Sequence, residues 1–478
     1  MNLGEYANRD ATELARLVRE GEVRPAELAG LAIEACEKVN GALNGVIEIY
    51  DDAADQPDVP PGSDQLLAGV PYLRKDIGAT EQGRLVEMGS RLCEGMVAPR
   101  DSFYTVRAKA AGLRYLGRST TSELGLHGTA ETLACGATSN PWDTARVAGG
   151  SSGGAAAMVA AGVVPMAHAS DGAGSIRIPA ACCGLVGLKP SRGRVTGGPA
   201  MGHPRLTTEL VVSRTVRDTA AALDALAGSE PGEPFDIAEP DVAWISSMQT
   251  DPGRLRIAVS ALVPDGSPVD PQVADNVWAT ARMLEGLGHE IVEAAPDYGY
   301  ERLRETFGDL FAVIATAAVP IIAKRFGRPI DESTLEPVTL RWWERAREID
   351  ALTYDAALVT CDRIARRIGV FHTEFDLVLT PVLTSPPPLL GTQGGTQHHL
   401  SYDQSLDLLF SFFPFTPAIN ASGQPAIALP TGQTKDRLPV AVQFSARFGD
   451  ETTLLRVAAQ LEEAMPWRDR QPPVHAAA

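Results

Sequence analysis

Basic residues are scarce in this chain of 478 residues, which holds 42 lysines and arginines against 60 aspartates and glutamates. The formal charge is −18, so no basic surplus exists to neutralise phosphates, and nucleic acid is excluded as a partner. Residues 1–19 lack the basic segment followed by an apolar one that marks a secretion signal. We expect no stretch to be apolar enough, for long enough, to span a bilayer. The sequence therefore predicts a cytoplasmic protein that does not act at a membrane.

Cysteine is also sparse, and its spacing excludes two further classes of protein. The six cysteines include no C-x-x-C pair and no small disulfide framework, so we expect reduced thiols in the core. The eight histidines are scattered, and the one adjacent pair, His398 and His399, would point in different directions on any regular element. The sequence thus predicts no metal site.

What the chain does contain suits a globular protein with a large core, since 44% of its residues are hydrophobic and 21% are charged. Helical and strand patterns alternate, which predicts an α/β fold. We expect helices at residues 11–20, 24–39, 105–112, 302–325 and 336–367, strands at 66–73, 113–116, 255–260 and 375–379, and loops at 51–64, 251–253 and 386–395. No linker or internal repeat is visible, so one domain is the simpler interpretation.

The middle of the chain, residues 149–187, consists almost wholly of glycine, alanine, serine and small aliphatic residues. It contains two glycine-flanked serines, Ser151 and Ser175. Such loops are often turns or anion sites, but a P-loop needs a lysine after its last glycine, and a G-x-G-x-x-G fingerprint needs glycine where Arg177 stands. The G-x-S-x-G pattern around Ser151 matches a nucleophile elbow, yet residues 141–146 before it hold a proline and two charges instead of a buried strand. Nucleotide binding and the elbow are both disfavoured.

A lysine, Lys75, follows the apolar run at residues 66–73, and by itself it would be expected to pair with Asp76 or another acid. Together, Lys75 and the two glycine-flanked serines resemble the amidase signature family. The likeness includes its lysine strand, its signature block and its C-terminal motifs, at residues 68–76, 149–189, 376–381 and 415–426, and so covers nearly the whole chain. The Ala-Gly-Ser loop at residues 173–175, together with residues 135–142 and 449–461, is most similar to bacterial amidases of the 6-aminohexanoate cyclic dimer hydrolase group.

The resemblance implies a fold and a domain organisation. We expect a single domain over residues 1–478, with a central mixed, twisted β-sheet flanked by helices. A helical N-terminal segment would occupy about residues 1–45 and the signature core about residues 65–220. The C-terminal part, about residues 250–470, would complete the sheet and the pocket.

The resemblance also implies a Ser-cisSer-Lys triad, with Ser175 as nucleophile, Ser151 as a bridging serine whose peptide bond is typically cis, and Lys75 as base. A serine hydroxyl is a poor nucleophile unless a base adjoins it, and a Ser–Lys arrangement is a known substitute for Ser-His-Asp. Burial favours the neutral form that a lysine must adopt to act as a base. We expect an acyl-enzyme on Ser175 and a reaction that uses no metal and no cofactor.

The loop around the nucleophile is expected to supply an oxyanion hole, through the backbone N–H groups of Gly172, Ala173, Gly174 and Ser175. Ala173 stands where many family members have glycine, which requires a backbone position that avoids positive φ. Asp171 and Arg177 are interpreted as residues that order this loop. Ser152 is interpreted as the cap of the following helix.

The substrate is the least determined feature. Ordinary core packing explains each candidate pocket residue equally well; the candidates are Gly125, Leu126, His127, Phe311, Phe415 and Ile419. Their apolar surroundings favour a small hydrophobic amide as substrate, although esters and carbamates would react by the same chemistry. A glutamine-hydrolysing subunit of a tRNA-dependent amidotransferase and an inactive binding scaffold are competing functions that stay open. The expected partner is a small molecule, with a homodimer left open.

Overall fold

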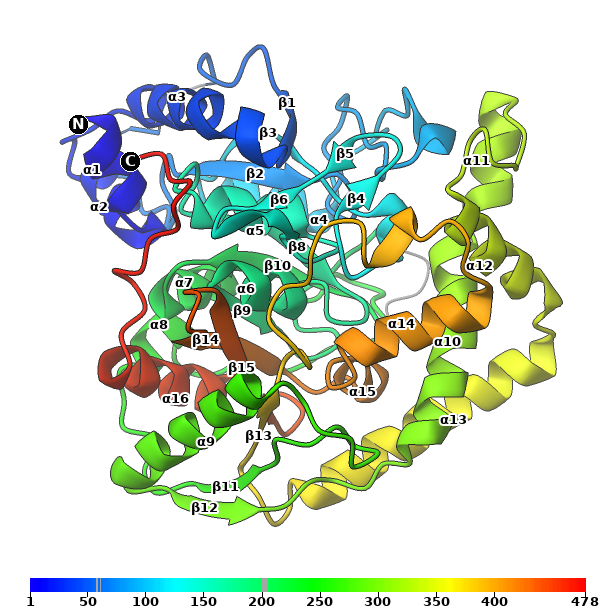
Figure 1. Ribbon diagram of the computed structural model, residues 1–478. Coiled ribbons are helices and arrows are strands. Elements are labelled where there is room, and N and C mark those ends of the chain that lie inside the picture. The colour runs from blue at the N-terminus through cyan, green and yellow to red at the C-terminus, as the bar shows by residue number, and fades with distance from the viewer. Residues whose placement is uncertain (57–58, 61, 200–204) are drawn as a thin grey trace.

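The structure of the chain, a computed structural model, describes residues 1–478 except 57–58, 61 and 200–204 (Figure 1). Parts of the predicted loop at 51–64 and of the predicted core at 65–220 therefore lie outside the described residues. In the described part, helices and strands alternate along the chain, and the helices flank one large sheet.

The central sheet has eleven strands, in the order β1-β3-β2-β8-β10-β9-β14-β15-β13-β11-β12. It is mixed, because β2 runs parallel to β3 and β8, and β11 runs parallel to β12 and β13, whereas the other neighbours are antiparallel. Its strands are β1 (Val46–Ile49), β2 (Pro71–Lys75), β3 (Arg114–Ser119), β8 (Met166–Asp171), β9 (Val186–Lys189), β10 (Thr208–Ser213), β11 (Arg256–Val259), β12 (Glu290–Glu293), β13 (Leu377–Pro381), β14 (Ala426–Gln433) and β15 (Pro439–Ala446). The predicted α/β fold with a central mixed sheet is confirmed.

The strands at the centre of the first half of the chain are covered on both faces. Every residue of β2, β3, β8 and β10 is buried, which is why these segments lack the alternation of a strand with one wet face. The strand predicted at 66–73 starts later, at Pro71, because the preceding turn includes Gly69 with a φ of 69°. Two short hairpins precede Ser151, and they pair β4 (Glu131–Thr132) with β5 (Gly136–Ala137) and β6 (Ser139–Asn140) with β7 (Asp143–Val147).

The helices carry most of the remaining chain. They are α1 (Leu3–Asn8), α2 (Ala11–Arg19), α3 (Pro25–Leu43), α4 (Phe103–Ala110), α5 (Gly153–Ala160), α6 (Arg177–Cys183), α7 (Val216–Leu226), α8 (Trp244–Ser247), α9 (Pro271–Gly286), α10 (Tyr300–Thr316), α11 (Val319–Phe326), α12 (Pro337–Glu348), α13 (Ala351–Phe371), α14 (Tyr402–Phe412), α15 (Pro417–Ser422) and α16 (Glu451–Ala464). Short 3-10 turns occur at Arg91–Cys93, Glu123–Gly125 and Gly394–Thr396. The sequence did not predict α1, which begins with a capping box formed by Asn2 and Glu5.

Two predicted long helices are wrong in extent, because each is two helices in the structure. The segment at 302–325 divides into α10 and α11, and Pro320 in the first turn of α11 has no N–H to continue the hydrogen bonds of α10. The segment at 336–367 divides into α12 and α13, because the side chain of Asp350 caps α13 by accepting a hydrogen bond from the Thr353 nitrogen. These helices form a layer to one side of the sheet, with α10 and α13 side by side (Figure 1).

The expectation that no stretch has the composition to span a bilayer is also wrong. Residues Tyr300–Phe326 are long and apolar enough, with a mean hydropathy of 1.9 over their most apolar window. In the structure 56% of that window is buried, and Phe307 and Phe311 stack on each other inside the protein. A buried helix in the core of a protein can have the same apolar composition as a membrane span. One such stretch is therefore weak evidence for a membrane span.

Helix α5 explains the small residues near the middle of the chain, because all eight of its residues are buried. A Cβ on Gly154 would lie 2.3 Å from Thr120 Oγ1 and 2.4 Å from the Gly45 carbonyl oxygen. We expect Gly154→Ala to lower the free energy of unfolding by about 3 kcal/mol through overpacking. Gly30→Ala is the matched control, because nothing lies within 4 Å of its Cβ position and helix α3 should gain about 0.5–1 kcal/mol. Urea unfolding followed by circular dichroism measures both; equal stability of the two variants would contradict the prediction.

Candidate active site

Lys75 ends β2 in the interior of the sheet, and its side chain is fully buried. Its Nζ atom lies 2.7 Å from Ser151 Oγ and 2.9 Å from Ser170 Oγ. Burial lowers the pKa of Lys75 to about 7, although the carboxylates of Glu209 and Asp171 act in the opposite direction. A large fraction of this lysine is therefore neutral at pH 7 and able to accept a proton.

Ser151 lies where a loop enters α5, and the Gly150–Ser151 peptide bond is cis. A Cβ on Gly150 would lie 2.5 Å from the Thr129 backbone nitrogen, so the close approach of two chain segments requires glycine before Ser151. Ser152 occupies the N-cap position of α5, but its side chain makes no cap hydrogen bond. Its hydroxyl points towards β8 instead and donates to the Ser170 carbonyl at 3.4 Å, so the predicted capping role is wrong.

Ser175 lies in the tight loop between β8 and α6, and it is 7% exposed. Gly174 beside it has a φ of 132°, whereas Ala173 avoids positive φ, which an alanine at this position requires. Among the residues that the structure describes, Ser175 Oγ makes no hydrogen bond. The transfer of a proton from Ser175 to Ser151 therefore remains a prediction.

Asp171 and Arg177 hold the loop that contains Ser175 from inside. The Asp171 carboxylate accepts hydrogen bonds from the Gly174 nitrogen at 2.7 Å and from the Ile176 nitrogen at 3.2 Å. Two nitrogens of Arg177 donate to the same carboxylate, both at 2.9 Å, and both side chains are completely buried. The Gly174 N–H is thus already occupied, which contradicts its predicted place in the oxyanion hole.

C-terminal residues anchor this pair of charges. The Asn420 side chain donates to Asp171 and accepts from Arg177 at 2.6 Å. The Gln443 side chain accepts from Arg177 at 2.7 Å, and the Thr416 hydroxyl donates to the Ala173 carbonyl at 2.6 Å. Segments more than 200 positions apart in sequence thus fix one loop.

Replacing Asp171 by asparagine is expected to destabilise the protein, because it leaves the buried guanidinium of Arg177 without its counter-charge. The expected loss is about 3–5 kcal/mol in the free energy of unfolding, which urea titration at pH 7 measures. Burial opposes ionisation of Asp171, but Arg177 and Asn420 hold its pKa at about 2, below the ordinary 3.8. The stability from this shift is therefore complete above pH 3.8 and is lost as the pH falls towards 2. Asp436→Asn, at an exposed position, is the control; equal effects of the two substitutions would contradict the prediction.

The structure divides the six candidate pocket residues into two groups. Gly125 and Phe311 lie at the site, since a Cβ on Gly125 would be 3.7 Å from Ser151 Oγ and a Cβ on Gly172 would be 3.4 Å from the Phe311 ring. Leu126 and His127 follow in the same loop and are buried, and burial lowers the pKa of His127 to about 4.

The remaining two candidates, Phe415 and Ile419, line a cavity of about 350 Å³ that also includes Tyr298, Tyr300 and Gln443. The cavity is connected to the Ser175 loop through Gln443, which accepts a hydrogen bond from Arg177. Ser175 itself is not in contact with the cavity.

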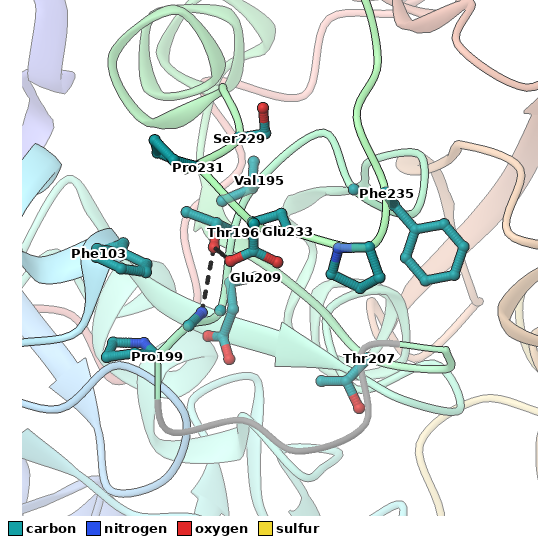
Figure 2. A pocket seen from close by; sticks show the side chains of 15 residues that line it. Phe103, Val195, Thr196, Pro199, Thr207, Glu209, Ser229, Pro231, Glu233 and Phe235 are labelled. Carbon is teal, nitrogen blue, oxygen red and sulfur yellow. Dashed lines mark hydrogen bonds between the residues drawn. The ribbon is translucent and has the colours of Figure 1, made fainter.

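A second cavity of about 350 Å³ is lined by residues that include Thr207 and Glu209 (Figure 2). Thr207 lines it and lies 3.3 Å from the position of a Cβ on Gly172. Two carboxylates, Glu209 and Glu233, contribute to its wall, and its lining contains no lysine, arginine or histidine among the residues that the structure describes. Figure 2 shows the Glu209 side chain among the lining residues.

Sequence reasoning missed three polar residues next to Lys75, namely His168, Ser170 and Glu209. His168 and Ser170 alternate along β8, so they share a face and lead to Asp171. This alternation within an otherwise apolar strand was the available signal. Glu209 reaches them only through the pairing of β8 with β10, which places it opposite Ser170.

No group of three or more histidine, cysteine, aspartate or glutamate residues able to hold a metal ion occurs in the described ranges. All six cysteines are free thiols, and five of them are buried. The polar groups next to Lys75 include the hydroxyls of Ser151 and Ser170 and the imidazole of His168.

Known proteins are similar to this chain in sequence and in structure. A family model described as "Amidase" matches residues 27–455. The 6-aminohexanoate-cyclic-dimer hydrolase of Paenarthrobacter ureafaciens is 35% identical, with 97% of this chain and 96% of that protein covered. A putative amidase AmiC of Mycobacterium leprae is 36% identical, with 96% of this chain and 95% of that protein covered. A solved structure of 6-aminohexanoate cyclic dimer hydrolase complexed with substrate superimposes with a TM-score of 0.89, at 34% identity and with 98% and 99% of the two chains covered.

Proposed function

Because the chain belongs to the amidase family, we propose that it is a serine hydrolase that cleaves amide bonds of small hydrophobic molecules through an acyl-enzyme on Ser175. The observation that carries this proposal is the 2.7 Å contact between Lys75 Nζ and Ser151 Oγ, made by a buried lysine with a pKa of about 7. Such a lysine is half neutral at pH 7, so it is a competent general base.

The proposed reaction begins with a proton relay. Neutral Lys75 accepts the proton of Ser151 while Ser151 accepts the proton of Ser175. The freed oxygen of Ser175 attacks the amide carbonyl carbon, and the carbonyl electron pair moves onto oxygen to give a tetrahedral intermediate.

The proposed oxyanion hole has fewer backbone donors than the sequence predicted. Gly174 donates to Asp171, so the donors proposed here are the backbone N–H groups of Gly172, Ala173 and Ser175. Asp171 and Arg177 contribute indirectly, because they fix the loop before substrate arrives. Donors fixed in advance stabilise the oxyanion without reorganisation cost during the reaction.

The relay then runs in reverse. Protonated Lys75 returns its proton through Ser151 to the amine nitrogen, and the carbon–nitrogen bond breaks to leave an acyl group on Ser175. A water molecule next loses a proton to the same base and attacks the acyl carbon. Release of the carboxylic acid restores all three side chains to their starting protonation.

The substrate proposal rests on the lining of the site and on the names of relatives. Phe311 lies beside the nucleophile loop, which favours an apolar acyl or amine group. Relatives named as acting on 6-aminohexanoate cyclic dimer support a linear or cyclic amide. The same triad would serve esters and carbamates, and these remain within the proposal, as does a homodimer in the cytoplasm. Glutamine hydrolysis for a tRNA-dependent amidotransferase and a purely binding role are the competing functions.

A panel of substrates tests the proposal directly. Purified protein should release amine from aryl, aliphatic or cyclic amides, with the ester and carbamate analogues measured in parallel. The Ser175→Ala variant is the control for contaminating activity. Hydrolysis confined to glutamine, or stimulated by tRNA, would favour the amidotransferase subunit. Absence of any hydrolysis across the panel would favour the binding scaffold.

A further inference from the structure

A buried pair of side chains, His168 on β8 and Glu209 on β10, lies next to Lys75, because the backbone N–H of Lys75 contacts His168 and His168 contacts Glu209. The strand register places Glu209 opposite Ser170, whose hydroxyl is 2.9 Å from Lys75 Nζ. His168 is two residues before Ser170, so both side chains lie on the same face of the sheet. The pair is therefore on the face of the sheet where Lys75 meets Ser170.

Hydrogen bonds fix the protonation of this pair. The backbone N–H of Lys75 donates to His168 Nδ1 at 3.2 Å, so Nδ1 carries no proton. Burial lowers the pKa of His168 and keeps the ring neutral, which places its single proton on Nε2. Nε2 therefore donates to Glu209 Oε2, which is the acceptor of this hydrogen bond.

Within the described ranges, no lysine or arginine forms an ion pair with Glu209. Its second oxygen, Oε1, is sealed from solvent and makes no hydrogen bond within the described part of the chain. Gly78, with a φ of 95°, closes over it so tightly that a Cβ there would lie 2.6 Å from Oε1. His168 is neutral, and the other carboxylate that acts on Lys75, Asp171, is already paired with Arg177. With Asp171 paired to Arg177 and His168 neutral, Glu209 is the acid of this cluster that no lysine or arginine pairs with among the described residues, and a protonated Lys75 would supply the missing positive charge.

Three further cations lie near this cluster, and none forms an ion pair with Glu209 in the part of the chain that the structure describes. Lys189 of β9 acts on Asp171, and burial lowers the pKa of Lys189 to about 7. On β2, Arg74 donates to Tyr50 and to backbone carbonyls, and on β3, Arg118 pairs with Asp76. Helix α5 contributes no titratable side chain. The phenols facing Glu209 are Tyr72 of β2 and Tyr104 of α4, and burial raises the pKa of both well above the ordinary value, so both stay uncharged.

We propose that Glu209, held in place by His168, is a positioning residue that stabilises the ammonium form of Lys75 when Lys75 takes the proton from Ser151. This inference rests on the proposed function, because it assigns a counter-charge to the base of that reaction. Glu209 takes no direct part in the proton relay. Burial lowers the basicity of Lys75, and the negative charge of Glu209 partly restores it.

The Glu209→Gln variant tests the proposal, because glutamine keeps an acceptor for His168 and removes only the charge. Loss of a nearby opposite charge should move the acid limb of the kcat/KM profile to lower pH by about 1 unit and reduce the plateau at high pH. Glu344→Gln is the matched control, since Glu344 is an exposed residue of α12 away from the Lys75 cluster. Its profile should coincide with that of the wild type.

A second readout does not depend on substrate. NMR of protein labelled with ¹³C at lysine Cε should show the Lys75 titration, assigned by its loss in Lys75→Met, shifted to lower pH in Glu209→Gln. An unchanged NMR midpoint, or an activity reduced equally at every pH, would overturn the proposal in favour of a structural role. An NMR shift in a protein that hydrolyses nothing would instead reject the proposed function and retain the charge pairing. If Glu209→Gln does not fold, Glu209→Asp retracts the charge by one methylene and should give a smaller shift of the same sign.

Discussion

Replacing Ser175 by alanine is expected to lower kcat by a factor on the order of 10⁴ or more, because removal of a covalent nucleophile leaves only binding and oxyanion stabilisation. Substrate binding should change little, since the side chain is small and makes no hydrogen bond with the described residues. The folded state should also be preserved for the same reason. Steady-state kinetics on the best substrate of the amide panel, together with thermal unfolding, measure both effects.

Covalent labelling gives the same variant a direct chemical readout. A fluorophosphonate should label the wild type at a single site and should fail to label Ser175→Ala. Ser246→Ala, at an exposed position in α8, should label and turn over as the wild type does. Labelling of Ser175→Ala at the wild-type rate would show that another hydroxyl is the nucleophile. Ser151 would then be the first hydroxyl to replace, because it already contacts Lys75.

The fold was predictable where local pattern determines structure. Alternating helix and strand signals indicate the α/β class, and the strand predicted at 255–260 closely matches β11. Local pattern failed where one residue interrupts a long amphipathic segment, as Pro320 and Asp350 do. Both residue types are typical of helix starts, so the signal for the division is present in the sequence. The order of the eleven strands was not accessible, because pairing between distant segments depends on their packing in three dimensions.

The residues of the site that belong to sequence motifs were predictable, and the contacts between distant segments were not. Lys75 and Ser151 are brought to 2.7 Å, as a shared site requires. The sequence misassigned Ser152 and Gly174 because the direction of a side chain or an N–H depends on neighbours from other strands. Glu209 escaped notice for a related reason, since only the antiparallel register of β8 and β10 sets it opposite Ser170. A single charged residue in a strand carries no signal of that register.

Replacing Lys75 by methionine is expected to remove the base while keeping a side chain of similar length. The loss in kcat/KM should be on the order of 10⁴, since the proton of Ser151 would have no acceptor. In the wild type, the pKa of about 7 predicts a rate that falls about tenfold for each pH unit below 7, because only neutral Lys75 accepts a proton. A profile that stays flat from pH 5 to 8 would contradict the assignment of Lys75 as base.

The same substitution makes a prediction about stability that holds whether or not a substrate is known. Burial lowers the pKa of Lys75 from its ordinary 10.5 to about 7, so between these values the unfolded chain binds one more proton than the folded chain. The contribution of Lys75 to wild-type stability should therefore rise with pH in this window, by about 1.4 kcal/mol per unit, and Lys75→Met should lack that contribution. All other titrating groups are common to both proteins, so the difference between their urea unfolding curves isolates Lys75. Lys435→Met, at an exposed position, should run parallel to the wild type. A constant difference between Lys75→Met and the wild type from pH 7 to 9.5 would mean that Lys75 is charged in the folded protein, and the relay would then lack its base.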